Sequence, residues 1–528
     1  MTSNPDDHYR SVCIRQWPPL AWVAKLSPSK SLHLWHGVRV ERRKSWFGEL
    51  CWDGDFEAGN IASGEHVFGS GGQHTDDGWT FVSSSTVLDR LHHFCEPSLA
   101  EETPVPSGRT DYVSNSLVAL AAVAGLSPMV SGTHYPKRFK TICRGLSEYD
   151  REIPMDRGPV HLTYMENLRW RQGRFKRIPK NVGTRRLDCF EDYHREMVSV
   201  LNRLAGNWSA KERCFQYEPI ASLSTGYDSP AASVLGKEVG LTDSITITSG
   251  RSGDQDDGAT IADHLGLQVS RLDRDQWRRS PLSEVTYLAG DGKGEDVYFA
   301  PAAGELSGRV LLTGYGGNRV WGAKPSLSNR FERSDQSGLS HTEARLHQGY
   351  LHLPVPFLVA HQTADLRRIT HSSPMSGWHV GREYNSPIAR RIIEEAGVPR
   401  EAFGVTKKAA SILMYDSSSS LSDEGDASFQ RWQARRLPRF DQIQLHVQRY
   451  FYRGRGFAIR AMQQFAGAMG RVIPIRVLGR IAGSSRLSEM AGYEAHFRYL
   501  FPWASETLIG QYRQTWLAAR SPDRLHEE

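Results

Sequence analysis

Residues 220–230 read Ile-Ala-Ser-Leu-Ser-Thr-Gly-Tyr-Asp-Ser-Pro, an apolar run followed by a turn of small polar residues. The run predicts a buried strand, and the residues after the turn predict a helix. Backbone N–H groups at the start of a helix bind anions, because the helix dipole is positive there. Ser224, Thr225 and Ser229 add hydroxyl donors, and Gly226 lets the backbone approach a ligand closely. We interpret the turn as a phosphate-binding site, and a plain helix N-cap after a tight turn is the alternative.

The sequence around this turn alternates between apolar strands and helical segments. Strands are expected at residues 219–224, 244–248, 268–272 and 308–313, and helices at residues 230–239 and 257–265. Strands that alternate with helices at this spacing predict a parallel, doubly wound α/β sheet. Ligands of such sheets bind beyond the carboxyl ends of the strands, which is where the turn is expected to lie.

The turn resembles the first motif, SGG-x-DS, of the synthetase domain in the asparagine synthetase family of ATP-pyrophosphatases. Three later segments resemble that family in the same order. A second strand and a helix that ends in His-Leu-Gly correspond to residues 245–250 and 261–266. Residues 313–322 correspond to the motif SGEG-x-DE-x-F-x-G, and residues 387–411 to a helix followed by a lysine-bearing loop.

This resemblance implies the adenine nucleotide alpha-hydrolase-like fold and an ATP-dependent, AMP-forming amide synthetase. ATP with Mg²⁺ would activate a carboxylate as an acyl-AMP, and an amine would then attack it. The positions implied to bind ATP and pyrophosphate are Leu223, Ser224, Thr225, Gly226, Asp228, Ser229, Ser249, Thr313 and Gly314. The metal positions are Asp228 and Asn318, and the catalytic positions are Tyr315 and a lysine, for which Lys407 matches best and Lys408 is the alternative.

The chain departs from the family pattern at three of these positions. Tyr315 and Asn318 replace two acids, and Thr225 replaces a glycine. An acidic stretch at residues 291–296 (Asp291, Glu295 and Asp296) is expected either to replace the lost charge or to form an acidic surface loop. An amide ligase is therefore the first hypothesis, and a catalytically degenerate nucleotide-binding or scaffold protein is the alternative. An RNA thiolation enzyme with a similar loop is disfavoured, because no CxxC pair or RNA-binding module is present.

Three regions are expected. Residues 1–185 show short β-like runs broken by glycine and serine, with a helical segment near residues 116–125, which predicts an α+β domain. Its resemblance to a glutaminase domain is weak, and it begins Met-Thr where glutaminases have Met-Cys. The amine would then be free ammonia or part of the acceptor, as in β-lactam synthetases and lasso-peptide cyclases. Residues 186–425 form the synthetase-like domain, and residues 426–528 a helical region.

Composition restricts the class of protein. The 528 residues are 39% hydrophobic and 23% charged, with a net charge of +6, which is typical of a globular protein with large cores. We expect no nucleic-acid partner. The six cysteines show neither zinc-ligand nor CxxC spacing, so reduced thiols are expected. The first residues contain acids and no apolar segment, and residues 113–136 look like a buried helix and a turn, so we expect a soluble, cytoplasmic protein.

The C-terminal region is helical in pattern and rich in arginine. Between residues 431 and 486 the only acid is Asp441, whereas the arginines are Arg431, Arg435, Arg436, Arg439, Arg449, Arg453, Arg455, Arg460, Arg471, Arg476, Arg480 and Arg486. Either a solvated helical face or a surface for anionic membrane or an acidic partner is expected. The polar residues 416–426 are expected to form a mobile surface loop, either a lid beside the lysine pair or a plain linker.

Overall fold

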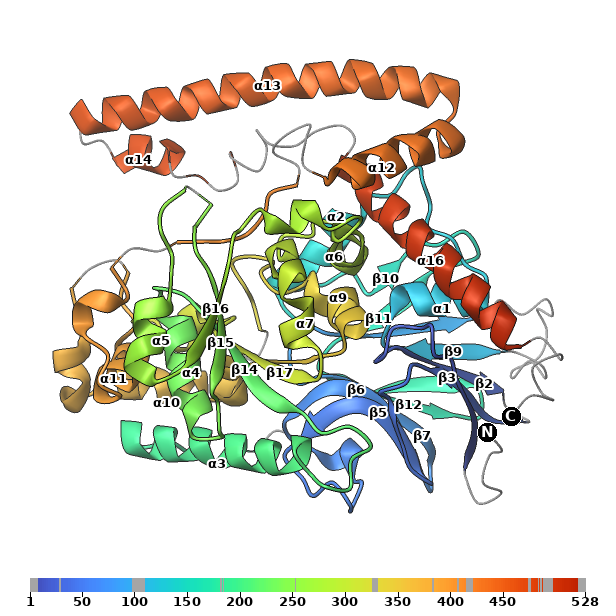
Figure 1. Ribbon diagram of the computed structural model, residues 1–528, viewed down its shortest axis with the longest axis horizontal. Helices are drawn as coiled ribbons and strands as arrows, with labels where there is room; N and C mark the ends of the chain where they lie inside the picture. The colour runs from blue at the N-terminus through green and yellow to red at the C-terminus, as the bar shows by residue number, and fades with distance from the viewer. Residues whose placement is uncertain are drawn as a thin grey trace.

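The computed structural model describes residues 8–27, 30–96, 110–180, 183, 185–251, 253–324, 331–381, 384–405, 408–414, 421–472, 476–482, 484, 487 and 497–520. A parallel sheet lies beside a pair of mostly antiparallel sheets, and helices from the C-terminal part cross the outside of both (Figure 1). The fold is thus mixed α/β, with one parallel sheet and a helical C-terminal region, as expected at that level.

The parallel sheet has five strands in the order β16-β15-β14-β17-β18. They are β14 (Glu218–Leu223), β15 (Asp243–Ile247), β16 (Gln268–Leu272), β17 (Arg309–Thr313) and β18 (Leu351–Pro354). Every neighbouring pair is parallel. The three central strands β15, β14 and β17 are largely buried, which explains why they read as apolar runs instead of alternating patterns.

Helices connect these strands and surround the sheet. They are α3 (Phe190–Trp208), α4 (Asp228–Lys237), α5 (Ala259–Leu265), α6 (Glu284–Asp291), α7 (Ala303–Leu306), α8 (Gly317–Val320), α9 (His341–Gln348), α10 (Thr363–Thr370) and α11 (Pro387–Glu395). Helix α4 packs on β14 and β17, and α11 packs on α4. All four strands and both helices that the sequence predicted around the turn are confirmed, with ends shifted by one or two residues.

The N-terminal part consists of two sheets that face each other. The first, in the order β1-β3-β2-β9-β8-β11-β10, contains β1 (Tyr9–Cys13), β3 (Lys30–His36), β2 (Trp22–Ser27), β9 (Asp111–Ser114), β8 (Leu91–Cys95), β11 (Val160–Thr163) and β10 (Glu152–Ile153). The second, in the order β13-β12-β7-β6-β5-β4, contains β13 (Arg174–Pro179), β12 (Glu166–Arg171), β7 (Gly78–Val82), β6 (Val67–Thr75), β5 (Trp46–Trp52) and β4 (Glu41–Arg42). Aromatic side chains from both sheets, including Trp22, Phe47 and Phe81, form the core between them.

Helix α1 (Leu117–Ala124) is the helix predicted near residues 116–125, and all eight of its side chains are buried. Ser116 caps its first turn by accepting a hydrogen bond from the Ala119 N–H, and Gly125 ends it in the left-handed region at φ 71°. Helix α2 (Tyr135–Lys140) follows. No disulfide links the six cysteines, all of which lie in described parts of the chain, and of the six Cys51 alone is buried.

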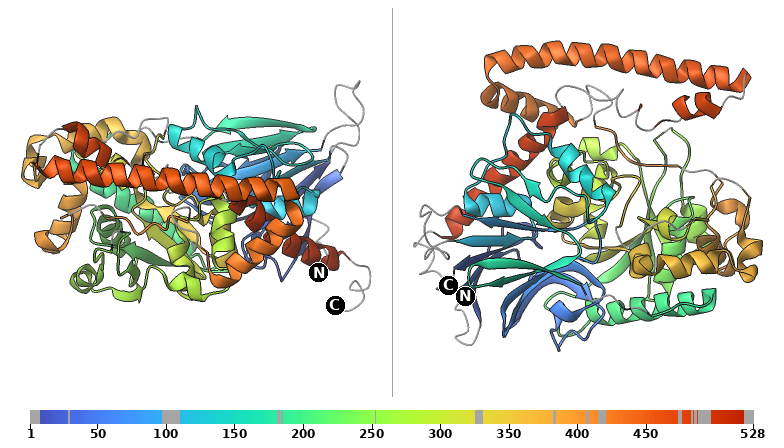
Figure 2. Two further views of the ribbon diagram at one scale, coloured as in Figure 1. Left: turned by 90° about the horizontal axis from the view of Figure 1, so that it is seen from above. Right: turned by 180° about the vertical axis from the view of Figure 1, so that it is seen from behind.

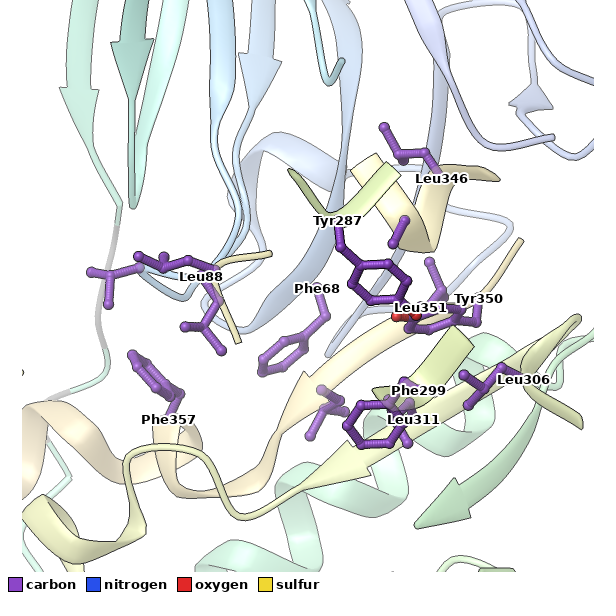
Figure 3. Packing of buried hydrophobic residues seen from close by; sticks show 14 of the residues in the cluster. Phe68, Leu88, Tyr287, Phe299, Leu306, Leu311, Leu346, Tyr350, Leu351 and Phe357 are labelled. Carbon is purple, nitrogen blue, oxygen red and sulfur yellow. The ribbon is translucent and has the colours of Figure 1, made fainter. Parts of the chain in front are cut away.

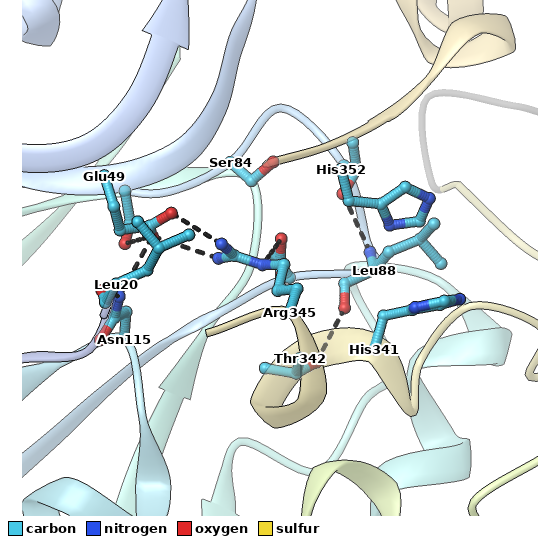
Figure 4. A network of polar contacts seen from close by, with 12 residues as sticks. Leu20, Glu49, Ser84, Leu88, Asn115, His341, Thr342, Arg345 and His352 are labelled. Atoms are coloured by element: carbon cyan, nitrogen blue, oxygen red, sulfur yellow. Dashed lines mark hydrogen bonds and ion pairs between the residues drawn. The ribbon is translucent and has the colours of Figure 1, made fainter. Parts of the chain in front are cut away.

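The two-sheet part and the parallel sheet share one continuous core. Phe68 and Leu88 approach Phe357 and Leu351 across the junction (Figure 3). A buried ion pair crosses the same junction, where Arg345 on α9 binds Glu49 on β5 through two hydrogen bonds of 2.6 and 3.1 Å (Figure 4). The two parts are therefore held in a fixed relation by packing and by charge.

The C-terminal helices are α12 (Asp423–Arg436), α13 (Arg439–Val472), α14 (Arg476–Ala482) and α16 (Leu500–Ala519). Helix α16 packs on α1 of the N-terminal part and on α6. The Trp17 Nε1–H donates to the Tyr512 carbonyl oxygen at 3.2 Å, and Trp35 packs edge-on against Trp516. Within the described residues, no helix combines the length and the apolar character needed to cross a membrane.

The polar segment expected as a loop at residues 416–426 is partly helical. Residues 415–420 lie outside the described residues, but residues 423–426 form the first turn of α12. Ser422 caps this helix through its side chain, and three acids in the first turn interact favourably with the helix dipole. The prediction was wrong for these residues because Ser422, which caps the helix, stands after a run of serines that is typical of a loop. Short 3₁₀ turns complete the fold: η1 (Ile61–Ser63), η2 (Thr141–Arg144), η3 (Gln276–Arg279), η4 (Val297–Ala302), η5 (Val355–Gln362), η6 (Ser373–Trp378), η7 (Arg400–Ala402) and η8 (Phe497–Tyr499).

Candidate functional site

The turn after β14 lies where the direction of the sheet reverses. From β14 the chain adds β15 and β16 on one side, and then β17 and β18 on the other. In open α/β sheets this switch point is where ligands bind. Gly314, which follows β17, presses against the first residue of α4, since a Cβ there would lie 2.4 Å from the carbonyl carbon of Asp228. The turns after two neighbouring strands are therefore in backbone contact.

Two serines close the turn on itself. The Ser224 N–H donates to the Ser229 hydroxyl at 3.0 Å, and the two hydroxyl oxygens are 2.8 Å apart. The Gly226 N–H also points to the Ser224 hydroxyl, at 3.4 Å. These contacts gather two N–H groups and two hydroxyls at the N-terminus of α4, the end of a helix that favours anions.

Asp256, which follows β15, reaches the same turn. Its Oδ1 accepts from the Thr225 N–H at 3.1 Å and from the Thr225 hydroxyl at 2.7 Å. The approach is close because Gly258 lies against the start of the turn, with a would-be Cβ 3.1 Å from the Ser224 nitrogen. Asp256 thus occupies a position at the turn that an anionic ligand would compete for.

Of the two candidate lysines, Lys407 lies outside the described residues, and Lys408 reaches the turn. The Lys408 ammonium donates to the Thr225 hydroxyl at 3.3 Å and to the Gln255 carbonyl oxygen at 2.5 Å. Arg274 fixes the segment after it by donating to the carbonyl oxygens of residues 410 and 411, both at 2.8 Å. The lysine-bearing segment is therefore anchored beside the turn at residues 224–229.

Residues 384–404 hold the other side of the turn. The Tyr227 N–H donates to the Tyr384 hydroxyl at 3.3 Å, and the Gly404 N–H donates to the Thr225 carbonyl oxygen at 2.8 Å. Burial and then the Asp228 carboxylate, with a further contribution from Asp256, raise the pKa of the Tyr384 hydroxyl. The negative charges of Asp228 and Asp256 therefore both favour the protonated form of the Tyr384 hydroxyl.

Tyr315 points away from the turn into a buried polar network. Its hydroxyl donates to Asp296 Oδ1 at 3.0 Å and lies 3.2 Å from the Tyr298 hydroxyl. The second oxygen of Asp296 accepts from the Gly338 N–H and from the Ser340 hydroxyl, at 2.9 and 2.6 Å. Burial, followed by the Asp296 charge, raises the pKa of Tyr315. Its hydroxyl is thus engaged with Asp296 in the protein interior.

The acidic stretch at residues 291–296 is buried, so its interpretation as an acidic surface loop was wrong. Asp291 accepts from two backbone N–H groups, at 2.8 and 3.0 Å, and burial raises its pKa to about 7. Glu295 forms a buried ion pair with Lys293 at 3.2 Å. Asp291 and Glu295 therefore contact their own loop, and Asp296 belongs to the Tyr315 network. Asn318 lies half-buried in α8, directly after Gly317, whose Cβ would lie 2.5 Å from the Asp228 carboxyl carbon.

The remaining candidate positions lie at the carboxyl edge of the sheet. Leu223 ends β14, and Ser249, just beyond β15, forms an isolated bridge with Gln255. Thr313 ends β17, and its hydroxyl lies 2.9 Å from His352 Nε2 on β18. The backbone of these residues follows three adjacent strands, as an adenosine site at this edge requires.

A separate cluster could hold a cation near the junction of the two parts. Asp53, Glu65 and His66 place their ligand atoms within 4.8 Å of one another. His66 Nδ1 lies 2.9 Å from Asp53 Oδ2, and its Nε2 lies 2.9 Å from the Leu358 carbonyl oxygen. Burial lowers the pKa of the neighbouring Lys180 to about 7, although the Asp53 charge opposes that shift. An ordinary charged network accounts for these contacts equally well.

No protein-family model matches the chain, and the comparison with curated proteins gave no match.

Two residues at the turn were missed by the sequence reasoning. Asp256 had a detectable signal, because it follows the second strand of a parallel sheet and must emerge at the same edge as the turn. Tyr384 had none, since its approach depends on how the segment before α11 folds back over the sheet.

Proposed function

We propose that the chain binds ATP at residues 224–229 and uses it to adenylate a carboxylate, which an amine then attacks to form an amide. The observation that carries this proposal is that Asp256 and Lys408 both hydrogen-bond Thr225, in the turn that leads to Asp228 at the N-terminus of α4 and lies at the switch point of the sheet. Helix N-termini with a nearby cation stabilise phosphate charge, and the order of the motifs resembles the asparagine synthetase family.

The turn residues have defined roles in this proposal. The N–H groups of residues 224–227 and the hydroxyls of Ser224 and Ser229 bind the pyrophosphate portion of ATP. Lys408 stabilises the phosphate charge as the carboxylate displaces pyrophosphate, and again as the amine displaces AMP. The backbone of Leu223, Ser249, Thr313 and Gly314 contacts the adenosine. In this proposal the amine is free ammonia or belongs to the acceptor.

The donor set at the turn fits Mg²⁺. Carboxylate oxygens are the ligands that this ion prefers; Asp256 contacts Thr225 in the turn, and Asp228 is the first residue of α4 directly after it. Asp228 and Asp256 would hold the ion, with the Asn318 amide as a neutral third donor. Mg²⁺ would neutralise pyrophosphate charge there. Asp256 would thereby replace the acid that is absent at Asn318, a role that was one of the two alternatives for residues 291–296.

A second function, a nucleotide-binding or scaffold protein without catalysis, is favoured by one specific observation. All four N–H groups of residues 224–227 already have acceptors within the chain: Ser229, Asp256, Ser224 and Tyr384. A ligand must displace these contacts before it can bind.

Calorimetry and pyrophosphate release separate the two functions. The intact chain is titrated with ATP in the presence of Mg²⁺, and pyrophosphate is measured in a screen of carboxylates and amines. Asp228→Ala should abolish both signals, whereas Asp192→Ala, which removes an acid that is one-third exposed on α3, should leave them unchanged. ATP binding without pyrophosphate release for any pair supports the scaffold, and the absence of ATP binding refutes the nucleotide site itself.

A further inference from the structure

Helix α13 exposes a continuous apolar stripe. Six of the exposed hydrophobic side chains that the structure describes on it are Ile443 (66%), Val447 (65%), Phe451 (69%), Phe457 (74%), Phe465 (66%) and Val472 (78%), and a seventh is Met462 (44%). At about 100° per residue, these six positions fall within an arc of about 120° on one side of the helix. Single apolar residues are ordinary on a protein surface, but a stripe of aromatic and branched side chains marks a site that binds another protein or a membrane.

The position of α13 leaves this stripe open. The helix runs along one edge of the molecule in Figure 1 and in the right view of Figure 2, and it crosses the near face in the left view, seen from above; α14 is its main packing neighbour. Among the hydrophobic side chains of α13 that the structure describes, Ala466 is the only fully buried one. With 34 residues, α13 is about 51 Å long, so the stripe forms a long and nearly straight edge.

The positive charge of α13 indicates what kind of partner it binds. Residues 439–472 contain six arginines and one acid, Asp441. Among them, Arg439 and Arg460 are exposed, as is Arg480 on α14. A second copy of this chain would bring one arginine-rich helix against another, which like-charge repulsion opposes. An anionic surface is attracted to the arginines, and a flat one contacts a straight helix along its whole length.

We propose that α13 binds the headgroup region of an anionic membrane, lying in the plane of the membrane with its apolar stripe inserted. A large apolar arc, flanking arginines and exposure to solvent are the features of helices that bind in this way. The partner is a lipid surface with net negative charge, and the binding surface is separate from the phosphate-binding turn. The proposal therefore stands whether or not the chain forms amides.

Vesicle sedimentation tests this proposal with the full-length chain. One set of vesicles contains phosphatidylcholine alone, and the other contains equal parts phosphatidylcholine and phosphatidylglycerol. The chain should sediment with the anionic vesicles, and added salt should weaken binding because it screens the arginines. Equal binding to both vesicles, or binding to neither, overturns the proposal.

Matched variants locate the binding surface. The double variant Phe451→Asp/Phe465→Asp should bind the anionic vesicles at least tenfold more weakly. The control Val38→Asp/Met129→Asp alters side chains that are 54% and 40% exposed elsewhere, adds the same charge, and should bind as the parent does. Circular dichroism and melting temperature verify that each variant folds.

Two outcomes contradict the assignment to α13. The first is an equal loss of binding in both double variants. The second is a parent chain that is dimeric by light scattering, becomes monomeric in Phe451→Asp/Phe465→Asp, and does not sediment with vesicles. That result would make the stripe a contact between copies.

Discussion

The Asp256 carboxylate receives both hydrogen bonds that Thr225 can donate, from its backbone N–H at 3.1 Å and from its hydroxyl at 2.7 Å. A glycine at position 225, which the asparagine synthetase family pattern would have, could donate only the first. The identity of one side chain in the turn therefore determines how firmly a carboxylate is held where phosphate should bind.

Thr225→Gly should bind ATP more tightly. The variant loses one hydrogen bond that a ligand must otherwise displace, so its dissociation constant should fall about three- to tenfold. Thr225→Ser keeps the hydroxyl and should behave as the parent chain does. Calorimetry with ATP and Mg²⁺ measures both variants, and weaker binding by Thr225→Gly would show that Thr225 helps to bind the ligand.

Lys408→Met should abolish most pyrophosphate release while affecting ATP affinity less. Removing a cation that stabilises developing charge typically costs about 10²–10³ in rate. Lys407→Met provides the comparison, since the sequence favoured Lys407, which lies outside the described residues, whereas Lys408 contacts the turn. Initial rates and ATP dissociation constants are measured for both variants, and a larger loss in Lys407→Met would reverse the assignment.

Arg345→Met should destabilise the fold by about 3–5 kcal/mol, because it leaves two buried carboxylates without their cation. Arg345 is 2% exposed and binds Glu49 at 2.6 Å and Asp89 at 2.8 Å. Arg195→Met removes an arginine that is 66% exposed and should change stability by less than about 0.5 kcal/mol. Urea unfolding measures both, and similar midpoints would mean that the junction does not depend on this ion pair.

Asp291→Asn should stabilise the protein at alkaline pH and not below pH 4. Burial raises the pKa of Asp291 from 3.8 to about 7, so the folded state keeps a proton that the unfolded state releases. Stability is therefore lost as pH rises from about 4 to about 7, by at most about 4 kcal/mol at 1.36 kcal/mol per pKa unit. The asparagine is neutral throughout, so the difference in unfolding free energy should grow across that window. A constant difference between pH 4 and pH 8 would refute the raised pKa.

The sequence predicted the parallel sheet well because its strands are short apolar runs between helices with clear periodicity. β14, α4, β15 and α5 all lie within two residues of their expected positions. The strand order and the antiparallel pairings of the N-terminal part could not be predicted, because they depend on contacts between residues far apart in the chain. β1, for example, pairs with β3 in parallel, whereas β2 lies between β3 and β9.

The candidate site could be predicted where it is local in sequence. The turn and Gly314 follow from strands that end at one edge of the sheet. The direction of Tyr315 could not be foreseen, because it depends on Asp296, for which the sequence left open a place at the site or in an acidic surface loop and which the fold buries. The contact of Lys408 with Thr225 could not be foreseen either, because it brings together residues 183 positions apart.

The contact between Trp17 and Tyr512 joins residues 495 positions apart. During synthesis at roughly 5–20 residues per second, α16 leaves the ribosome about 25–100 seconds after the first strands. Until then the surface of α1 that α16 covers stays exposed on the nascent chain. The packing of α16 on α1 is therefore one of the last events of folding. A chain that ends before residue 500 leaves the apolar surface of α1 exposed and prone to aggregation.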